Sequence, residues 1–129
     1  MEKKVMKLLI VGSRSFTNYE LLKKECFNIL TPYINDNYEI VIVSGGANGA
    51  DKLGRDFALE NHFTYVEFPA KWEIFGRQAG AIRNTEMHRY ISDVPERMCI
   101  AFWDGMSKGT AQSFSIAKRY ENPITIIRY

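Results

Sequence analysis

The stretch Glu39–Asp51, which reads EIVIVSGGANGAD, contains the pattern that decides the fold. Its first half holds a compact apolar run, Ile40–Val43, and such a run is typical of a strand buried on both faces. Its second half is rich in glycine and leads into a segment where Leu53 and Phe57 recur at helical spacing. A buried strand, a glycine turn and an amphipathic helix in this order predict one unit of a parallel α/β sheet.

The same alternation of strand and helix extends through the rest of the chain. We expect the other strands at residues 5–11, 63–68, 97–103 and 123–128. We expect a first helix from Thr17 or Asn18 to residues 35–37, and further helices at 50–61, 81–91 and 109–120. Such alternation gives a parallel sheet with right-handed crossovers. The sequence therefore predicts an α/β protein, a single Rossmann-like domain over residues 1–129, with a mainly parallel sheet of order 3-2-1-4-5 flanked by helices.

Side chains expected in the core include both cysteines. The first helix carries Leu22, Cys26, Ile29 and Tyr33 at helical spacing, which predicts an inward-facing stripe. Cys99 lies in a predicted strand. The spacing of the two cysteines supplies no partners for a disulfide framework or a metal site, so we expect two reduced, buried thiols.

Composition and charge narrow the range of functions. The chain has 129 residues, of which 46% are hydrophobic, and this is enough for a proper core. A formal net charge of +2 is too small to indicate a nucleic-acid partner. His62 and His88 are isolated, so we expect neither a metal site nor another cofactor. The start lacks the features of a signal peptide and no run could span a bilayer, so we expect a cytoplasmic protein without a membrane partner.

Three glycine-bearing loops, at residues 12–15, 44–51 and 104–110, each lie between a predicted strand and a predicted helix. In a sheet of order 3-2-1-4-5 the three loops leave neighbouring strands at the same edge, where such folds bind ligands. Free backbone N–H groups and the positive end of a helix dipole attract phosphate at such junctions. The sequence therefore predicts one pocket for a phosphate-bearing small molecule.

The candidate ligand-binding residues come from these loops and from an Arg-Asn pair that opens the helix after the irregular segment at 70–80. They are Gly12, Ser13, Arg14, Ser44, Gly45, Gly46, Asn48, Gly49, Asp51, Arg83, Asn84, Gly109 and Thr110. Arg14 can donate two parallel hydrogen bonds to phosphate. Asp51 can hold a ligand hydroxyl or a loop amide, or can simply add favourable charge to the first turn of a helix.

Other candidates have two readings from the sequence alone. Asp104 is placed for a sugar hydroxyl or for acid–base chemistry, but it also suits an Asp-Gly turn. Residues 70–80 could fold over the pocket as a lid, in which Trp72 and Phe75 either pack on the sheet or stack on a base. Trp103, at the end of a predicted strand, is read in the same two ways, as a core side chain or as a stacking surface for a base.

These motifs together resemble the SLOG superfamily. The resemblance rests on Gly12-Ser13-Arg14, on Ser44–Asp51, on Ala79–Asn84 with Met87, and on Gly109-Thr110 before a helix. The superfamily joins the DNA-processing protein DprA (Smf) to the cytokinin-activating LOG enzymes, and this chain is most similar to its small YspA/YpsA-related branch of bacteria and phages. The resemblance implies a Rossmann-like fold and a nucleotide-type ligand at the glycine loops.

The resemblance also frames three hypotheses about function. The first is binding of a nucleotide-derived ligand for sensing, sequestration or processing. The second is nucleotide N-glycosidic hydrolysis of the LOG phosphoribohydrolase type, with Asp104 and Arg83 as candidate catalytic residues. LOG enzymes use a glutamate just after a Gly-Gly-x-Gly-Thr turn, and here Ala111-Gln112-Ser113 follows Gly109-Thr110, so Asp104 or Glu86 would have to substitute. The third, ranked last, is DprA-like binding of single-stranded DNA.

The resemblance further implies self-association. We expect a homo-oligomer, a dimer or larger, in which Trp72, Phe75 and Tyr90 are candidate interface residues. A small Rossmann-like domain often covers apolar helix surface in this way. No nucleic-acid partner is expected.

Overall fold

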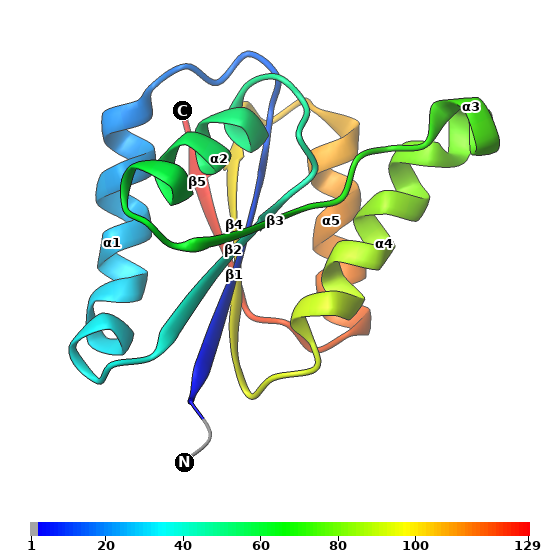
Figure 1. Ribbon diagram of the computed structural model, residues 1–129. Coiled ribbons are helices and arrows are strands. Elements are labelled where there is room, and N and C mark those ends of the chain that lie inside the picture. Colours follow the sequence, from blue (N-terminus) through cyan, green and yellow to red (C-terminus); the bar gives the residue numbers. More distant parts are fainter. Residues whose placement is uncertain (1–2) are drawn as a thin grey trace.

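The computed structural model describes residues 3–129 and has a parallel sheet between two layers of helices (Figure 1). The strands are β1 (Val5–Gly12), β2 (Glu39–Ser44), β3 (Thr64–Glu67), β4 (Glu96–Trp103) and β5 (Ile124–Arg128). The helices are α1 (Tyr19–Asn35), α2 (Ala50–Glu60), α3 (Trp72–Phe75), α4 (Ala79–Ile91) and α5 (Lys108–Arg119), with a 3₁₀ turn, η1 (Gly76–Gln78). In Figure 1, α1 and α2 cover one face of the sheet, and α4 and α5 cover the other.

The sheet has the order β3-β2-β1-β4-β5 with every pair parallel, which confirms the predicted fold class and strand order. β1 lies at the centre, where Leu8 pairs with Ile42 of β2 and with Met98 of β4. Alternate side chains of β1 enter different cores. Leu8 packs with the helices on one face, and Leu9 packs with those on the other. This two-sided burial explains why the strand reads as an unbroken apolar run.

The first helix is placed by its cap and by a stripe of buried residues. Asn18 caps α1, because its Oδ1 accepts a hydrogen bond from the Leu21 amide at 3.0 Å. The buried residues are Leu22, Cys26 and Leu30. The prediction of Ile29 and Tyr33 as inward positions needs correction, because both are only half-buried at the margin of the core. Residues 22, 26 and 30 repeat every four positions, and this row faces the sheet.

The two thiols and one histidine are buried as side chains of the core. Cys26 and Cys99 are free and fully buried, as expected. Burial lowers the pKa of His88 to about 4, so its ring is neutral at physiological pH. The Asn122 amide lies 3.1 Å from His88 Nδ1 and fixes the ring against α4.

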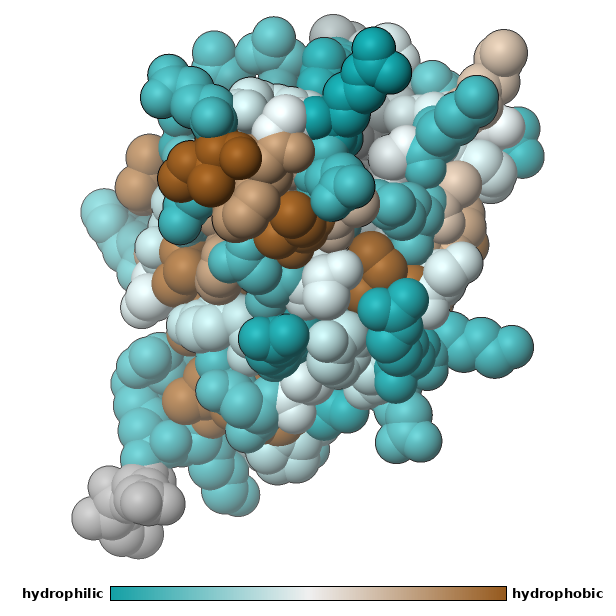
Figure 2. Space-filling model, turned by 90° about the vertical axis from the view of Figure 1, so that its right-hand side faces the viewer, coloured by the Kyte–Doolittle hydropathy of each residue, from teal (hydrophilic) through white to brown (hydrophobic). Residues whose placement is uncertain are grey.

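Residues 70–80 differ most from the sequence-based expectation. The segment contains α3 and η1, and α4 begins at Ala79 rather than at residue 81. Trp72 and Phe75 do not pack on the sheet, since 52% and 43% of their surfaces are exposed. A single helical turn has too few residues to bury a face, and residues 71–78 are all exposed. Figure 2 shows the side of the molecule that carries α3, α4 and α5, where hydrophobic side chains reach the surface in separate groups.

Within residues 3–129, the helices lack the combination of length and apolar character needed to cross a membrane.

Candidate functional site

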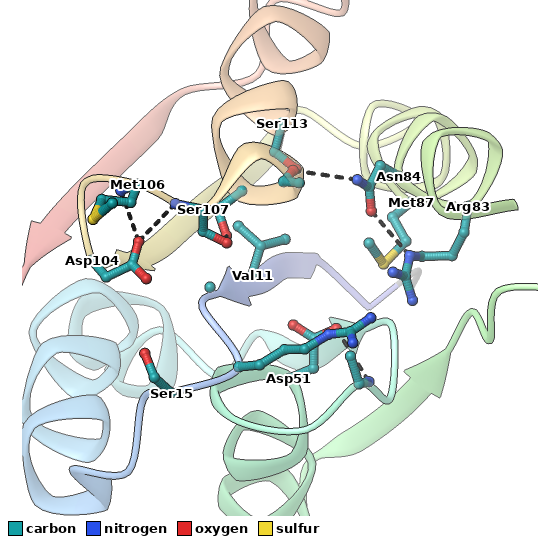
Figure 3. A pocket seen from close by; sticks show the side chains of 15 residues that line it. Val11, Ser15, Asp51, Arg83, Asn84, Met87, Asp104, Met106, Ser107 and Ser113 are labelled. Carbon is teal, nitrogen blue, oxygen red and sulfur yellow. Dashed lines mark hydrogen bonds between the residues drawn. The ribbon is translucent and has the colours of Figure 1, made fainter. Parts of the chain in front are cut away.

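The loops at the carboxyl ends of β1, β2 and β4 surround a cavity of about 630 Å³. This volume lies within the range of roughly 300–1,000 Å³ that is usual for small-molecule sites. Figure 3 shows side chains from α2, α4, α5 and the loop before α5 around this common space. The cavity is lined by Val11, Gly12, Arg14, Ser15, Ala47, Asp51, Arg83, Asn84, Met87, Asp104, Met106, Ser107, Gly109, Thr110 and Ser113.

The structure divides the predicted site residues into two groups. Those that line the cavity are Gly12, Arg14, Asp51, Arg83, Asn84, Asp104, Gly109 and Thr110. Those outside its lining are Ser13, Ser44, Gly45, Gly46, Asn48 and Gly49. Three of the second group, Gly45, Gly46 and Asn48, line an adjoining smaller cavity instead. Of the other three, Ser13 bonds the first loop to the third, Ser44 bonds within the second loop, and Gly49 lies against the Ser13 carbonyl, where a Cβ would clash.

Ser13 joins the first glycine loop to the third. Its amide donates to the Phe102 carbonyl at 2.9 Å, and its Oγ accepts from the Asp104 amide at 3.1 Å. Ser44 has a similar role in the second loop, because its Oγ donates to the Asp51 carbonyl at 3.0 Å. Both serines are buried. The two serines therefore position the loops that form the pocket but do not line the pocket themselves.

Asp51 brings a buried carboxylate to the base of the cavity, with only 6% of its surface exposed. The Ala47 amide donates to its Oδ2 at 3.4 Å, so Asp51 holds a loop amide, one of the roles considered from the sequence. Burial raises the pKa of this carboxyl to about 6, and the nearby positive charge of Arg83 opposes the rise. The glycine loop at α2 therefore already binds an anionic group of the protein itself.

The Arg-Asn pair on α4 ties the loops together. Arg83 donates from Nη1 to the Gly45 carbonyl at 2.9 Å and from Nε to Asn84 Oδ1 at 3.0 Å. Asn84 in turn donates to Gln112 Oε1 at 3.2 Å and reaches the Gly109 carbonyl at 3.5 Å. These contacts fix α4 to the second loop and to α5. The contact with Gln112 has no signal in the sequence, because it depends on how two helices pack.

Asp104 caps the turn that leads into α5. Its Oδ1 accepts hydrogen bonds from the amides of Met106 and Ser107, both at 2.8 Å. These two bonds lower the pKa of the Asp104 carboxyl, which is therefore ionised at neutral pH. Its position matches the Asp-Gly turn that the sequence allowed. Asp104 also lines the cavity.

The N-terminus of α5 faces the cavity, which Ser107, Gly109 and Thr110 help to line. Its N-cap residue, Ser107, makes no capping hydrogen bond with its side chain. The first amides of a helix, here those of Lys108, Gly109 and Thr110, have no intrahelical acceptor and carry the positive end of the dipole. Gly109 also leaves space above them, because a Cβ at this position would have no atom within 4 Å.

Three buried side chains form a floor that the sequence analysis did not identify. Val11 and Met87 supply apolar surface, and Ser113 adds a hydroxyl. Within residues 3–129, Ser113 Oγ has no hydrogen-bond partner. One signal was available, because Ser113 lies four residues after Gly109 on the same side of α5.

Arg14 supplies the free positive charge of the site. Its side chain is exposed, lines the cavity and forms no ion pair with any residue in 3–129. In the same part of the chain, His, Cys, Asp and Glu side chains form no cluster of three that could hold a metal ion.

Fold and site together define a Rossmann-like α/β protein with a cavity at the edge where the central strands end. The chain belongs to the YspA, cpYpsA-related SLOG family, whose model matches residues 6–75 and thus the first two glycine loops. It is 32% identical over 124 residues to the Gene 61 protein of Mycobacterium phage D29, covering 92% of this chain and 93% of that protein.

A structural comparison agrees with this assignment at the level of the fold. The X-ray structure of DNA processing protein A (DprA) from Streptococcus pneumoniae superimposes with a TM-score of 0.57 and 16% identity. The match covers 98% of this chain and 51% of DprA, so this chain spans about half the length of that protein. Membership of the SLOG family supports a nucleotide-related binding or processing role in general.

Proposed function

We propose that the protein binds a nucleotide-derived, phosphate-bearing ligand in the cavity of about 630 Å³. One observation carries the proposal: the N-terminus of α5, which the Ser107 side chain does not cap, and Arg14, which forms no ion pair within residues 3–129, line the same cavity. Backbone amides, a helix dipole and a guanidinium group are together the usual way in which proteins hold phosphate.

The phosphate belongs at α5 rather than at α2. At α2, the Asp51 carboxylate already accepts from the Ala47 amide of the loop. At α5, Asp104 accepts only from the amides of Met106 and Ser107, which precede the helix. The first helical amides are offered to the phosphate, and Arg14 neutralises its charge. Asp51 and Asp104, which line the same cavity, then face the ribose, whose hydroxyl groups can donate to their carboxylates.

The test of this proposal is calorimetry with AMP as the probe, comparing the native protein with Arg14→Ala. Loss of a charge-assisted contact costs about 1.5–3 kcal/mol, so we expect AMP affinity to fall about tenfold or more. The fold should be unchanged, because Arg14 is exposed and has no ion pair in the described chain. Arg119→Ala, another exposed arginine but at the far end of α5, is the control. Equal AMP affinity in Arg14→Ala and native protein refutes the assignment.

A second candidate function is hydrolysis of the N-glycosidic bond. It is favoured by the pKa of Asp51, which burial raises to about 6, because a carboxyl that titrates near neutrality can transfer protons. The ionised Asp104 would stabilise an oxocarbenium-like centre. Arg83 would position the second loop and α4, since it already donates hydrogen bonds to Gly45 and Asn84.

The test of hydrolysis is to incubate nucleoside monophosphates with the protein and to detect free base by chromatography. Native protein should release free base, and Asp51→Asn should abolish the release. If no free base is released, the hydrolysis hypothesis is refuted.

Self-association stays a prediction: we propose that the protein forms a homo-oligomer, a dimer or larger. The exposed apolar side chains of α3, with Trp72 and Phe75 among them, support it. Light scattering of native protein measures the assembly directly.

A further inference from the structure

A second cavity, of about 370 Å³, adjoins the proposed phosphate site. The two cavities share three lining residues, Arg14, Ala47 and Arg83. The shared guanidinium groups place positive charge at the junction. A ligand whose phosphate lies at α5 can therefore extend past the arginines into the second cavity, and the chemistry of that cavity indicates what it can accept.

One wall of the second cavity is the exposed ring of Trp72. The ring lies near Gly80 of α4, because a Cβ at Gly80 would be 3.5 Å from its Cη2. About half of the Trp72 surface remains open, at 52%. An open indole offers a stacking surface for a nucleobase, and such stacking tolerates any base because every base has a π face.

The end of β3 supplies the same cavity with a positioned carboxylate, that of Glu67. The Tyr65 hydroxyl donates to Glu67 Oε1 at 2.8 Å, and Tyr65 in turn lies 2.7 Å from the buried Ser44 Oγ. The carboxylate sits over Gly46, where a Cβ would be 2.7–2.9 Å from its atoms. Glycine at position 46, with φ +76°, therefore permits this close approach. In residues 3–129, Oε2 makes no hydrogen bond and is free to accept one.

Building on the proposed function, we infer that the second cavity is a subsite for a nucleobase that carries an exocyclic amino group. The base stacks on Trp72, and its amino group donates to Glu67 Oε2. An ionised carboxylate is an acceptor only, so it selects N–H donors and rejects a carbonyl at the same place. The ligand class is accordingly a nucleotide of adenine, cytosine or guanine, with its phosphate at α5.

The experiment is titration calorimetry with three probes: AMP, purine riboside 5′-monophosphate, which lacks only the amino group, and ribose 5-phosphate, which lacks the base. In native protein AMP should bind best, and ribose 5-phosphate should bind about tenfold or more weakly, as loss of a stacked base predicts. Trp72→Ala should reduce AMP affinity about tenfold and leave ribose 5-phosphate affinity unchanged. Glu67→Gln should remove most of the preference for AMP over purine riboside 5′-monophosphate.

Matched controls come from α3, where Ile74→Ala and Glu73→Gln change exposed side chains outside both cavities. These should bind all three probes as native protein does. Equal native affinity for AMP and ribose 5-phosphate overturns the subsite while the phosphate site stands. The subsite is also overturned if the Trp72→Ala and Glu67→Gln variants both keep the native preference for AMP over the other two probes. Failure of native protein to bind any of the three probes defeats the proposed function and the subsite together.

Discussion

Replacing Asp51 with asparagine tests whether burial of this carboxyl raises its pKa in the folded protein. Asparagine has nearly the same shape and keeps an oxygen that can accept from the Ala47 amide, but it carries no charge. In the folded protein, burial raises the pKa of Asp51 from 3.8 to about 6. Because the folded state holds this proton more tightly than the unfolded chain, Asp51 favours folding below pH 4. That contribution is lost as the pH rises through 6.

The size of the effect follows from the two pKa values. Each tenfold change in proton affinity is worth about 1.4 kcal/mol, so ionised Asp51 costs the folded state about 3 kcal/mol at neutral pH. Relative to native protein, the free energy of unfolding of Asp51→Asn should therefore rise by about 2–3 kcal/mol between pH 4 and pH 7.5. His88 acts in the opposite direction, since its pKa is lowered to about 4, but it is common to both proteins and cancels in the difference.

The assay is urea unfolding followed by circular dichroism across this pH range, in native protein and variant. Asp56→Asn, which removes an exposed carboxylate from the same helix, is the control. A difference between Asp51→Asn and native protein that stays flat with pH would falsify the argument. It would mean that water or Arg83 compensates fully for the burial.

Two further predictions concern stability. Gly12→Ala should destabilise the fold by about 2 kcal/mol or more, because a Cβ there would lie 2.5 Å from both Ala50 Cβ and the Phe102 carbonyl. Gly109→Ala is the matched control and should raise stability by up to about 1 kcal/mol, since alanine favours helix and meets no neighbour; equal melting temperatures for the two variants would contradict this account. Asn122→Ala should cost about 1–3 kcal/mol in urea unfolding, because it leaves His88 Nδ1 and Arg97 Nε without their partner. An unchanged midpoint would show that water replaces the amide.

The strands and their order could be predicted from the sequence, because a buried strand appears there as a short apolar run. Apolar runs such as Ile40–Val43 must be covered on both sides, and the helices between them leave little choice of topology. Residues 70–80 were less predictable. Trp72 and Phe75 are large apolar residues, which are usually buried. The one-turn helix α3, next to the start of α4, is too short to bury them.

For the site, the sequence indicated which loops meet but not how their polar groups are used. Arg14 lies in the loop after β1, and Asp51 lies in the first turn of α2 after the loop that follows β2, so both line the cavity. Ser44 does not, because its side chain turns inward to the Asp51 carbonyl. A serine hydroxyl at a strand end can point either way, and only packing decides. Ser113 was missed for the converse reason, since one serine on a helix carries no mark of facing a ligand.

The empty space above Gly109 has a consequence for how this scaffold can change its ligand. A Cβ added at that position would meet no side chain within 4 Å among residues 3–129. Alanine there therefore narrows the approach to the proposed phosphate site at α5 and leaves the packing of the core unchanged.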